Sequence, residues 1–307
     1  MVDPEVREHA FLWLAEQVVR NDYVIIRETL AKGFRIGNVT VALVGPRGIW
    51  KPKVCNLPVS ITSISNGPYD DSFTDDGLLL YRYQGDDPNH RDNAGLRELM
   101  RTRTPLVYFH SVVRGKYVPV WPVFIVEDMP ERLSCRVAVD PAYAAPGLAT
   151  VGMTDISHRD TPFADDSALG VRRYVATLTM QRLHQSSFRE RVISAYAHTC
   201  SLCRLKHNSL LDAAHIIPDT APDGDPIVNN GLCLCKIHHA AYDQNMIGIS
   251  PDYRVHVHDD ILNEADGPML RHGLQEVHGH VIVLPTRRRD YPDPERLERR
   301  YVDFCSA

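Results

Sequence analysis

The chain has 307 residues, 44% of them hydrophobic and 24% charged, a composition typical of soluble globular proteins of one large or two ordinary domains. Its formal net charge of −5 excludes a polycationic protein. Any contact with nucleic acid must therefore come from a local basic surface.

The first predicted element is an N-terminal helix, because apolar residues recur at helical spacing from Phe11 to Val19. Asp3 and Pro4 suit its N-cap and first turn. The segment lacks the basic start and the cleavage site of a secretion signal, and no apolar run reaches the ~18 residues of a membrane span. We therefore expect a cytoplasmic protein with no membrane partner.

Short runs of strand-forming residues dominate from about residue 33 to residue 140, separated by Gly, Pro, Asn and Asp. They indicate a compact β-rich domain built as a curved sheet or barrel with flanking helices. We expect this first domain to span residues 1–140. The runs begin at Asn38, Val59, Leu78, Pro105 and Lys116.

A linker is predicted over residues 141–170, where periodicity is weak and turn-forming residues are frequent. A helical pattern follows from Val171 to Thr199, and four of the seven cysteines then lie between Cys200 and Cys235. Because the cysteine count is odd and no export signal precedes them, metal binding suits them better than disulfides. We expect a second, metal-rich α/β domain over residues 171–307, and thus an α+β protein.

Two closely spaced pairs in this second domain predict a structural zinc site. Cys200 and Cys203 form a CxxC pair, and Cys235 and His238 form a CxxH pair. Each pair brings two ligands together on a tight turn, and thiolate with imidazole suits tetrahedral zinc. Cys233 is a competing thiol, but the spacing to His238 favours Cys235.

Between these pairs, the motifs "AAHIIP", "NNGLCLC" and "HHAAYD" resemble the HNH (ββα-metal) nucleases, in the branch found in modification-dependent restriction enzymes. The resemblance covers roughly residues 200–248. It implies that His215 is the general base and that His239 binds a catalytic divalent cation, Mg²⁺ or another. It also implies that Asn230, with Asn229 as the register alternative, holds the loop between strand and helix.

This chemistry is consistent with phosphodiester hydrolysis, which needs an activated water and a cation at the phosphate. A neutral imidazole with a pKa near ambient pH is a suitable base. The sequence departs from the family at Ala214, where many HNH enzymes carry Asp or His as a second cation ligand. Asp243, four residues after His239 on the predicted helix, is a candidate ligand, and an ordinary surface carboxylate is the alternative.

A second resemblance lies in the β-rich domain, where Ser65–Gly85 resembles the signature of SRA (YDG) domains, which read 5-methylcytosine. Gly115–Pro119 resembles a later strand of those domains. The resemblance implies an SRA/PUA-like fold and a pocket for a flipped cytosine, which needs an acceptor and an aromatic wall. Asp71, or Asp75 in the shifted register, is the expected acceptor, and Tyr69 and Tyr83 are the expected walls. A plain hairpin turn with Tyr83 as an ordinary strand residue is the alternative.

The segment after this motif, residues 86–104, is polar and contains four arginines. In SRA domains the loops after the motif enter the DNA grooves and fill the space left by the flipped base, so the resemblance implies this role for Arg91 or Asn93. The expected phosphate contacts are Arg97, Arg101 and Arg103. The alternative is a short solvated helix.

Together these features predict a type IV-like, modification-dependent restriction endonuclease. Its expected substrate is double-stranded DNA carrying 5-methylcytosine or 5-hydroxymethylcytosine, and cleavage of both strands favours a homodimer. One alternative is a zinc-containing DNA-binding adaptor without nuclease activity, and another is an HNH nuclease with a different base specificity. His215, Asn230 and His239 argue against the adaptor, because structural zinc needs none of them.

Overall fold

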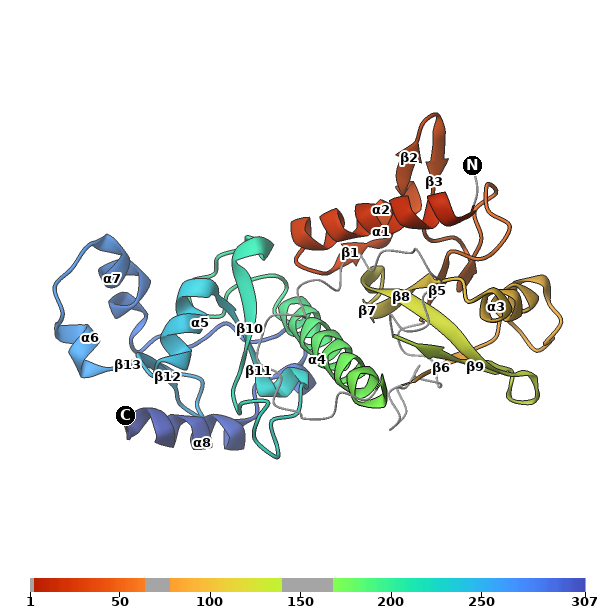
Figure 1. The fold of residues 1–307 in the computed structure, drawn as a ribbon. Helices are drawn as coiled ribbons and strands as arrows, with labels where there is room; N and C mark the ends of the chain where they lie inside the picture. The colour runs from red at the N-terminus through yellow and green to blue at the C-terminus, as the bar shows by residue number, and fades with distance from the viewer. Residues whose placement is uncertain (1–2, 64–77, 140–167, 307) are drawn as a thin grey trace. The chain divides into compact units, whose positions relative to one another are not determined.

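The computed structural model describes residues 3–63, 78–139 and 168–306 (Figure 1). It divides into two compact units, Met1–Ser186 and Ser187–Ala307. Both units mix helices and strands, which confirms the predicted α+β class. The division falls within helix α4 (Ala168–Ala195), and most of the predicted linker lies outside the described residues, so the predicted domain limits stay predictions.

A seven-stranded sheet organises the first unit in the order β4-β5-β7-β8-β9-β6, with β1 paired beside β8. Its strands are β1 (Ile25–Ile26), β4 (Ile49–Trp50), β5 (Ser60–Thr62), β6 (Leu79–Arg82), β7 (Leu106–Val113), β8 (Lys116–Met129) and β9 (Ser134–Ala138). Neighbours pair antiparallel except for β5 with β7. Register shifts interrupt the pairing of β8 with both β7 and β9. Because such bulges bend a sheet, they account for its curled, half-barrel form (Figure 1).

Helices flank both faces of this sheet. The remaining elements of the first unit are α1 (Asp3–Arg20), α2 (Arg27–Lys32), the hairpin β2 (Phe34–Ile36) and β3 (Val39–Val41), α3 (Arg91–Thr102) and the 3-10 turn η1 (Pro130–Arg132). Alternate residues of β7 point to opposite faces. Tyr108 packs in a core with Leu99 of α3, and Phe109 packs in a core with Phe11 and Leu14 of α1.

The acidic start of α1 has a different role from the predicted N-cap. Asp3 is itself helical, and its carboxylate accepts hydrogen bonds from the N–H groups of Asn56 and Leu57 at 2.9–3.1 Å. It also lies 3.9 Å from Arg7, whose buried guanidinium donates to the carbonyls of Pro58 and Pro105. Asp3 therefore ties α1 to a distant loop rather than satisfying the N–H groups of its own helix.

The second unit begins with the C-terminal part of α4 and contains the ββα order that the nuclease resemblance implies. Its elements are η4 (Asn208–Leu210), β10 (Leu211–His215), η5 (Val228–Asn230), β11 (Gly231–Cys235), α5 (Lys236–Asp243), β12 (Ile247–Ile249), β13 (Val255–Val257), α6 (Asp259–Asn263), α7 (Pro268–Gly273), η6 (Gln275–Val277), η7 (Arg288–Asp290) and α8 (Pro294–Cys305). β10 pairs antiparallel with β11, and β12 with β13. One core joins Val192 of α4, Tyr242 of α5 and Leu297 of α8 to these strands. Within the described ranges, no helix is long and apolar enough to cross a membrane.

Candidate metal centre and nuclease site

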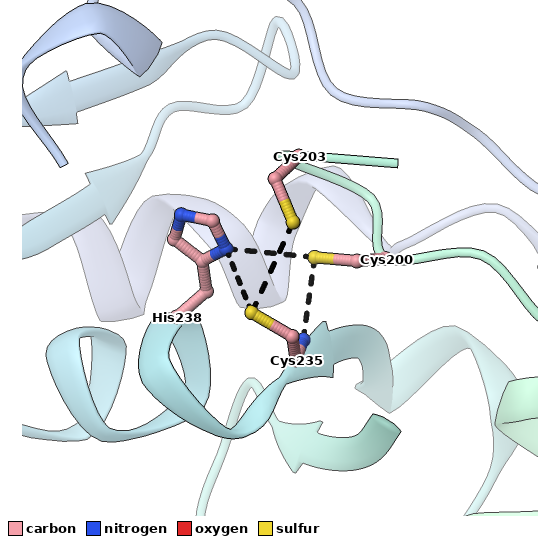
Figure 2. A group of neighbouring side chains, drawn as sticks. All are labelled: Cys200, Cys203, Cys235 and His238. Atoms are coloured by element: carbon pink, nitrogen blue, oxygen red, sulfur yellow. Dashed lines mark hydrogen bonds between the residues drawn. The ribbon is translucent and has the colours of Figure 1, made fainter. Parts of the chain in front are cut away.

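Four side chains converge beside the N-terminus of α5 (Figure 2). Cys200 and Cys203 lie in the turn after α4, Cys235 ends β11, and His238 lies in the first turn of α5. Their three sulfur atoms and an imidazole nitrogen all lie within 4.8 Å of one another. His238 Nδ1 is 3.6 Å from Cys200 Sγ and 3.2 Å from Cys235 Sγ.

These distances fit one tetrahedral zinc ion. Zinc bonds of about 2.3 Å to sulfur and about 2.0–2.1 Å to nitrogen place neighbouring ligand atoms roughly 3.5–3.8 Å apart. Cys203 Sγ and Cys235 Sγ are 3.9 Å apart, the distance of 3.6 Å from His238 Nδ1 to Cys200 Sγ lies within this range, and the distance of 3.2 Å to Cys235 Sγ is slightly shorter. Three thiols and one imidazole are also the donor set that zinc prefers.

The surroundings of the four ligands favour a cation at their centre. His238 Nε2 lies 2.6 Å from the carbonyl oxygen of Gly273, so the Nε2 proton is held there and the Nδ1 lone pair faces the sulfurs. Hydrogen bonds within the group lower the pKa of Cys200 and Cys235 and raise the pKa of Cys203, so two of the three thiols favour the thiolate form that binds metal. The Cys233 sulfur lies outside this group, and burial raises the pKa of that thiol to about 12.

The candidate base, His215, is the last residue of β10. Its ring stacks on Phe188 of α4, with ring centroids 3.9 Å apart and 17° between the planes. His215 Nε2 is buried without a hydrogen-bond partner in the part of the chain that the structure describes, so Nδ1 is the nitrogen suited to meet a water. Burial lowers the pKa of His215, and the nearby charge of Asp219 opposes this shift. The ring is therefore neutral at neutral pH, as a general base must be.

A glycine makes the contact between His215 and Phe188 sterically feasible. Gly231 lies directly opposite His215 in the strand pairing. A Cβ atom at Gly231 would lie 2.5 Å from a Val192 methyl carbon and 2.9 Å from the Phe188 ring. Because these are shorter than van der Waals contacts, only glycine lets α4 approach the strands closely enough.

Asn230 is fully buried and clamps the loop that follows β10. Its Oδ1 accepts from the Ile217 N–H at 2.9 Å, and its Nδ2 donates to the carbonyls of Ile217 and Asp225 at 3.0 and 3.1 Å. The clamped loop is therefore the one between β10 and β11, not one between strand and helix. Asn229 is partly exposed, and its carbonyl accepts from the Asp293 N–H.

His239 lies between two carboxylates. Its Nδ1 is 3.2 Å from Asp212 Oδ2 on β10, and its Nε2 is 3.3 Å from Asp243 Oδ2 on α5. Successive helix residues are rotated by roughly 100°, so His238 faces the sulfurs while His239 faces β10. The hydrogen bond with Asp212 is the main cause that raises the pKa of His239. Smaller electrostatic effects on the pKa of His215 come from His239 and Asp243, so these three residues share one electrostatic environment.

Sequence reasoning missed two residues of this site. Asp212 was detectable as an acidic residue inside an otherwise apolar strand, three positions before the candidate base. No sequence pattern indicates a role for Phe188, because its partner His215 lies on a strand that is distant in the chain.

The predicted base pocket of the first unit is only partly visible. Tyr69, Asp71 and Asp75 lie outside the described residues. Tyr83 packs in the core with 4% of its surface exposed, and its buried hydroxyl has no hydrogen-bond partner among the described residues.

The predicted DNA contacts divide into buried and exposed residues on α3. Asn93 is fully buried, and its amide accepts from the Gln84 N–H and donates to the carbonyls of Gln84 and Asp87. This side chain therefore fixes a loop and has no surface open to DNA, which corrects the prediction that it enters a groove. Arg91 is exposed beside Asp92 and remains the candidate for that role.

The three arginines predicted to contact phosphates also differ in their surroundings. Arg97 pairs with Asp128 at 3.2 Å and donates to the Pro88 carbonyl. Arg101 is exposed and paired with Glu98 at 2.6 Å. Arg103 is exposed at the C-terminal end of α3. Arg101 and Arg103 are therefore better placed to reach phosphates than Arg97.

Comparison with known proteins gives a domain assignment for the site. The HNH_2 family model, described as HNH endonuclease, matches residues 200–250, and this match implies nuclease activity. The matched segment contains β10, β11 and α5, with both metal-ligand pairs. No curated protein matches the chain.

Solved structures that are similar to this chain include two restriction endonucleases. One is titled "Modification dependent TagI restriction endonuclease", with 16% identity, a TM-score of 0.29, and coverage of 80% of this chain and 81% of that one. The other is the Type IV phosphorothioation-dependent restriction endonuclease ScoMcrA, with 17% identity, a TM-score of 0.22, and coverage of 60% and 48% respectively.

Proposed function

We propose that this protein, which contains an HNH endonuclease domain, is a modification-dependent restriction endonuclease. It recognises 5-methylcytosine or 5-hydroxymethylcytosine in double-stranded DNA and hydrolyses the phosphodiester backbone. The observation that supports hydrolysis is the ββα unit within residues 200–250, where His239 and Asp243 lie close enough to the neutral, half-buried His215 to influence its pKa. The SRA-like motif at Ser65–Gly85 and the curled sheet of the first unit support recognition of a modified base.

Hydrolysis at this site begins with His215. Its Nδ1 accepts a proton from the attacking water, while the stack on Phe188 keeps the ring in one orientation. His239 Nε2 and Asp243 would hold the divalent cation, and that cation would supply Lewis-acid stabilisation of the phosphate and the leaving oxygen. Asn230 keeps the loop after His215 in place, and so holds the end of β10 that carries the base.

The zinc centre has a structural role in this proposal. Cys200 and Cys203 join the end of α4 to Cys235 and His238 at the start of α5. These four residues would hold a zinc ion that ties the unit together around β10 and β11 and contributes folding free energy. All four ligand positions are then occupied by protein groups, which leaves the cation at His239 for the chemistry.

Some of the residues proposed to recognise the modified base lie outside the described ranges. In the proposal, Asp71 accepts the exocyclic amine of a flipped cytosine, with Asp75 as its alternative, and Tyr69 and Tyr83 form the pocket walls. Arg101 and Arg103 contribute phosphate contacts from the end of α3. Two chains cut the two strands as a homodimer.

Base recognition is tested without cleavage by using the His215→Ala variant. It is titrated with duplexes that carry cytosine, 5-methylcytosine or 5-hydroxymethylcytosine at one position, with 2-aminopurine as the neighbouring base. We expect tighter binding and an increase in fluorescence only with a modified base, because flipping unstacks the reporter. Asp71→Ala should remove this preference, and Asp75→Ala is the matched variant. Equal binding to all three duplexes would reject the reader assignment while leaving the nuclease assignment intact.

A further inference from the structure

We infer that Asp212 is a positioning residue for the cation site, which holds the proton of His239 on Nδ1 and leaves Nε2 free to bind the cation. The inference rests on the proposed function, since it concerns a ligand of the proposed catalytic cation. It adds a residue from β10 to a site otherwise formed by α5.

The contacts on the two sides of the imidazole carry this inference. Asp212 Oδ2 and Asp243 Oδ2 approach opposite ring nitrogens of His239, at 3.2 and 3.3 Å. A neutral imidazole carries one proton, and only the other nitrogen has a lone pair for a metal ion. The two carboxylates therefore have different roles: one accepts the ring proton, and the other lies beside the metal-binding nitrogen.

Asp212 is the carboxylate held in a fixed position. Its Oδ1 accepts from the Ala213 N–H at 2.9 Å and lies 3.4 Å from Arg189 Nε, which leaves Oδ2 for His239. Its side chain is 37% exposed, whereas that of Asp243 is 56% exposed. A carboxylate anchored in this way orients a metal-binding histidine, as in carboxylate–histidine–metal arrangements.

The spacing on the other side of the ring suits a cation. In octahedral coordination with bonds of about 2.1 Å, adjacent ligand atoms lie about 3 Å apart. His239 Nε2 and Asp243 Oδ2 are 3.3 Å apart, close to this value. Ala214 offers no ligand to such a cation, so the site depends on His239 and Asp243. The orientation of His239 then matters more than in a site with three protein ligands.

An isosteric substitution, Asp212→Asn, separates positioning from packing. The two donors at Oδ1, the Ala213 N–H and Arg189, would hold the new amide oxygen on their side. The amide NH₂ would then face His239 Nδ1 and donate to it, which moves the ring proton to Nε2. The variant keeps the shape and loses the correct tautomer, as a carboxylate-to-amide change does beside a catalytic histidine in serine proteases.

The test uses the full-length, zinc-loaded protein without DNA. Mn²⁺ affinity is measured by calorimetry, and the ring proton of His239 is located by ¹⁵N NMR of histidine-labelled protein above the pKa of His239. We expect Asp212→Asn to weaken Mn²⁺ binding about 10–100-fold and to move the proton to Nε2. Asp243→Asn should weaken binding with the proton still on Nδ1. Asp266→Asn, which makes the same charge change at an exposed position, should behave as wild type.

The outcomes separate the inference from the proposed function. If Asp212→Asn binds Mn²⁺ as wild type does and keeps the proton on Nδ1, the positioning role is wrong and the nuclease proposal stands. If the Asn variant does not fold, the ¹⁵N measurement on the wild-type protein still decides, because a His239 ring proton on Nε2 instead of Nδ1 would reject the inference. If wild-type protein binds no Mn²⁺, the cation site of the proposed function is wrong, and the positioning role falls with it.

Discussion

Substitution of Gly231 by alanine tests how α4 is held against the nuclease strands. The added Cβ would lie 2.5 Å from Val192 and 2.9 and 3.1 Å from two Phe188 ring carbons, inside van der Waals contact. Overpacking of this kind costs about 1–3 kcal/mol. Alanine in place of glycine ordinarily gains about 0.4–1 kcal/mol through the unfolded state, which offsets only part of this cost.

The added Cβ would displace the Phe188 ring, which stacks on His215. Gly231→Ala should therefore reduce DNA cleavage as well as stability. Local stability is measured by hydrogen exchange and mass spectrometry on peptides from β10 and β11. Trp13, Trp50 and Trp121 all lie in the first unit, so their fluorescence serves as an internal control that should not change.

The matched variant is Gly267→Ala, whose Cβ would have no atom within 4 Å. Gly267 is the N-cap of α7, where alanine is a poorer cap than glycine, but the gain of about 0.4–1 kcal/mol through the unfolded state offsets this loss, so the net change should be only about a few tenths of a kcal/mol. The double variant Gly231→Ala with Val192→Ala removes the closest contact of the added Cβ, which is with the Val192 methyl carbon. Its loss of stability should therefore differ from the sum of the losses in the two single variants. Wild-type protection and cleavage in Gly231→Ala would refute the close packing of α4 on the strands.

Three further predictions follow from the site. Cys203→Ala should lose bound zinc and unfold the second unit, since structural zinc contributes folding free energy. The tryptophan fluorescence of the first unit should not change. Full zinc content by mass spectrometry would contradict the role of Cys203 as a ligand. Cleavage should fall as the pH drops below a midpoint that lies under 6.5, because burial lowers the pKa of His215 and only the neutral ring accepts a proton. Asp219→Asn should move this midpoint further down, because the Asp219 charge raises that pKa, and an upward shift in the rate profile would count against His215 as the base. Asn230→Ala should destabilise the second unit by about 1–3 kcal/mol, since it leaves the buried N–H and carbonyl of Ile217 without partners. Asn229→Ala should cost little, and denaturant unfolding followed by zinc release compares the two.

Local spacing was sufficient to predict the parts of the site that lie close together in the chain. CxxC and CxxH pairs each fit within one turn, so their convergence could be anticipated, and the structure brings all four side chains together. The contact between His239 and Asp243 follows from helical periodicity alone. The long strand beginning at Lys116 was visible as a run of strand-forming residues.

Residues whose roles depend on tertiary contacts could not be predicted in this way. Asp212 meets His239 only because β10 packs beside α5, and Phe188 meets His215 only because α4 packs on the strands. Asn93 and Asp3 were misassigned for the same reason. Each is polar in a segment that suggested an obvious role, but the fold directs each side chain to distant or buried backbone groups instead.

The run from Asn38 shows a limit of strand prediction. The apolar pattern continues to Val44, but β3 ends at Val41. Leu43 donates its N–H to the Leu30 carbonyl of α2, and it is buried in the core beneath α1. Burial alone therefore accounts for the apolar residues beyond the strand, because a core position favours them whether or not the backbone pairs in a sheet.

Modification dependence is best measured by cleavage of matched duplexes in Mg²⁺, identical except for cytosine, 5-methylcytosine or 5-hydroxymethylcytosine at one site. We expect the wild-type protein to hydrolyse a modified duplex and to hydrolyse the unmodified one much more slowly. His215→Ala should lose both activities with its zinc content unchanged. Equal cleavage rates on all three duplexes would contradict modification dependence. Cleavage by His215→Ala at the wild-type rate would contradict the assignment of the base.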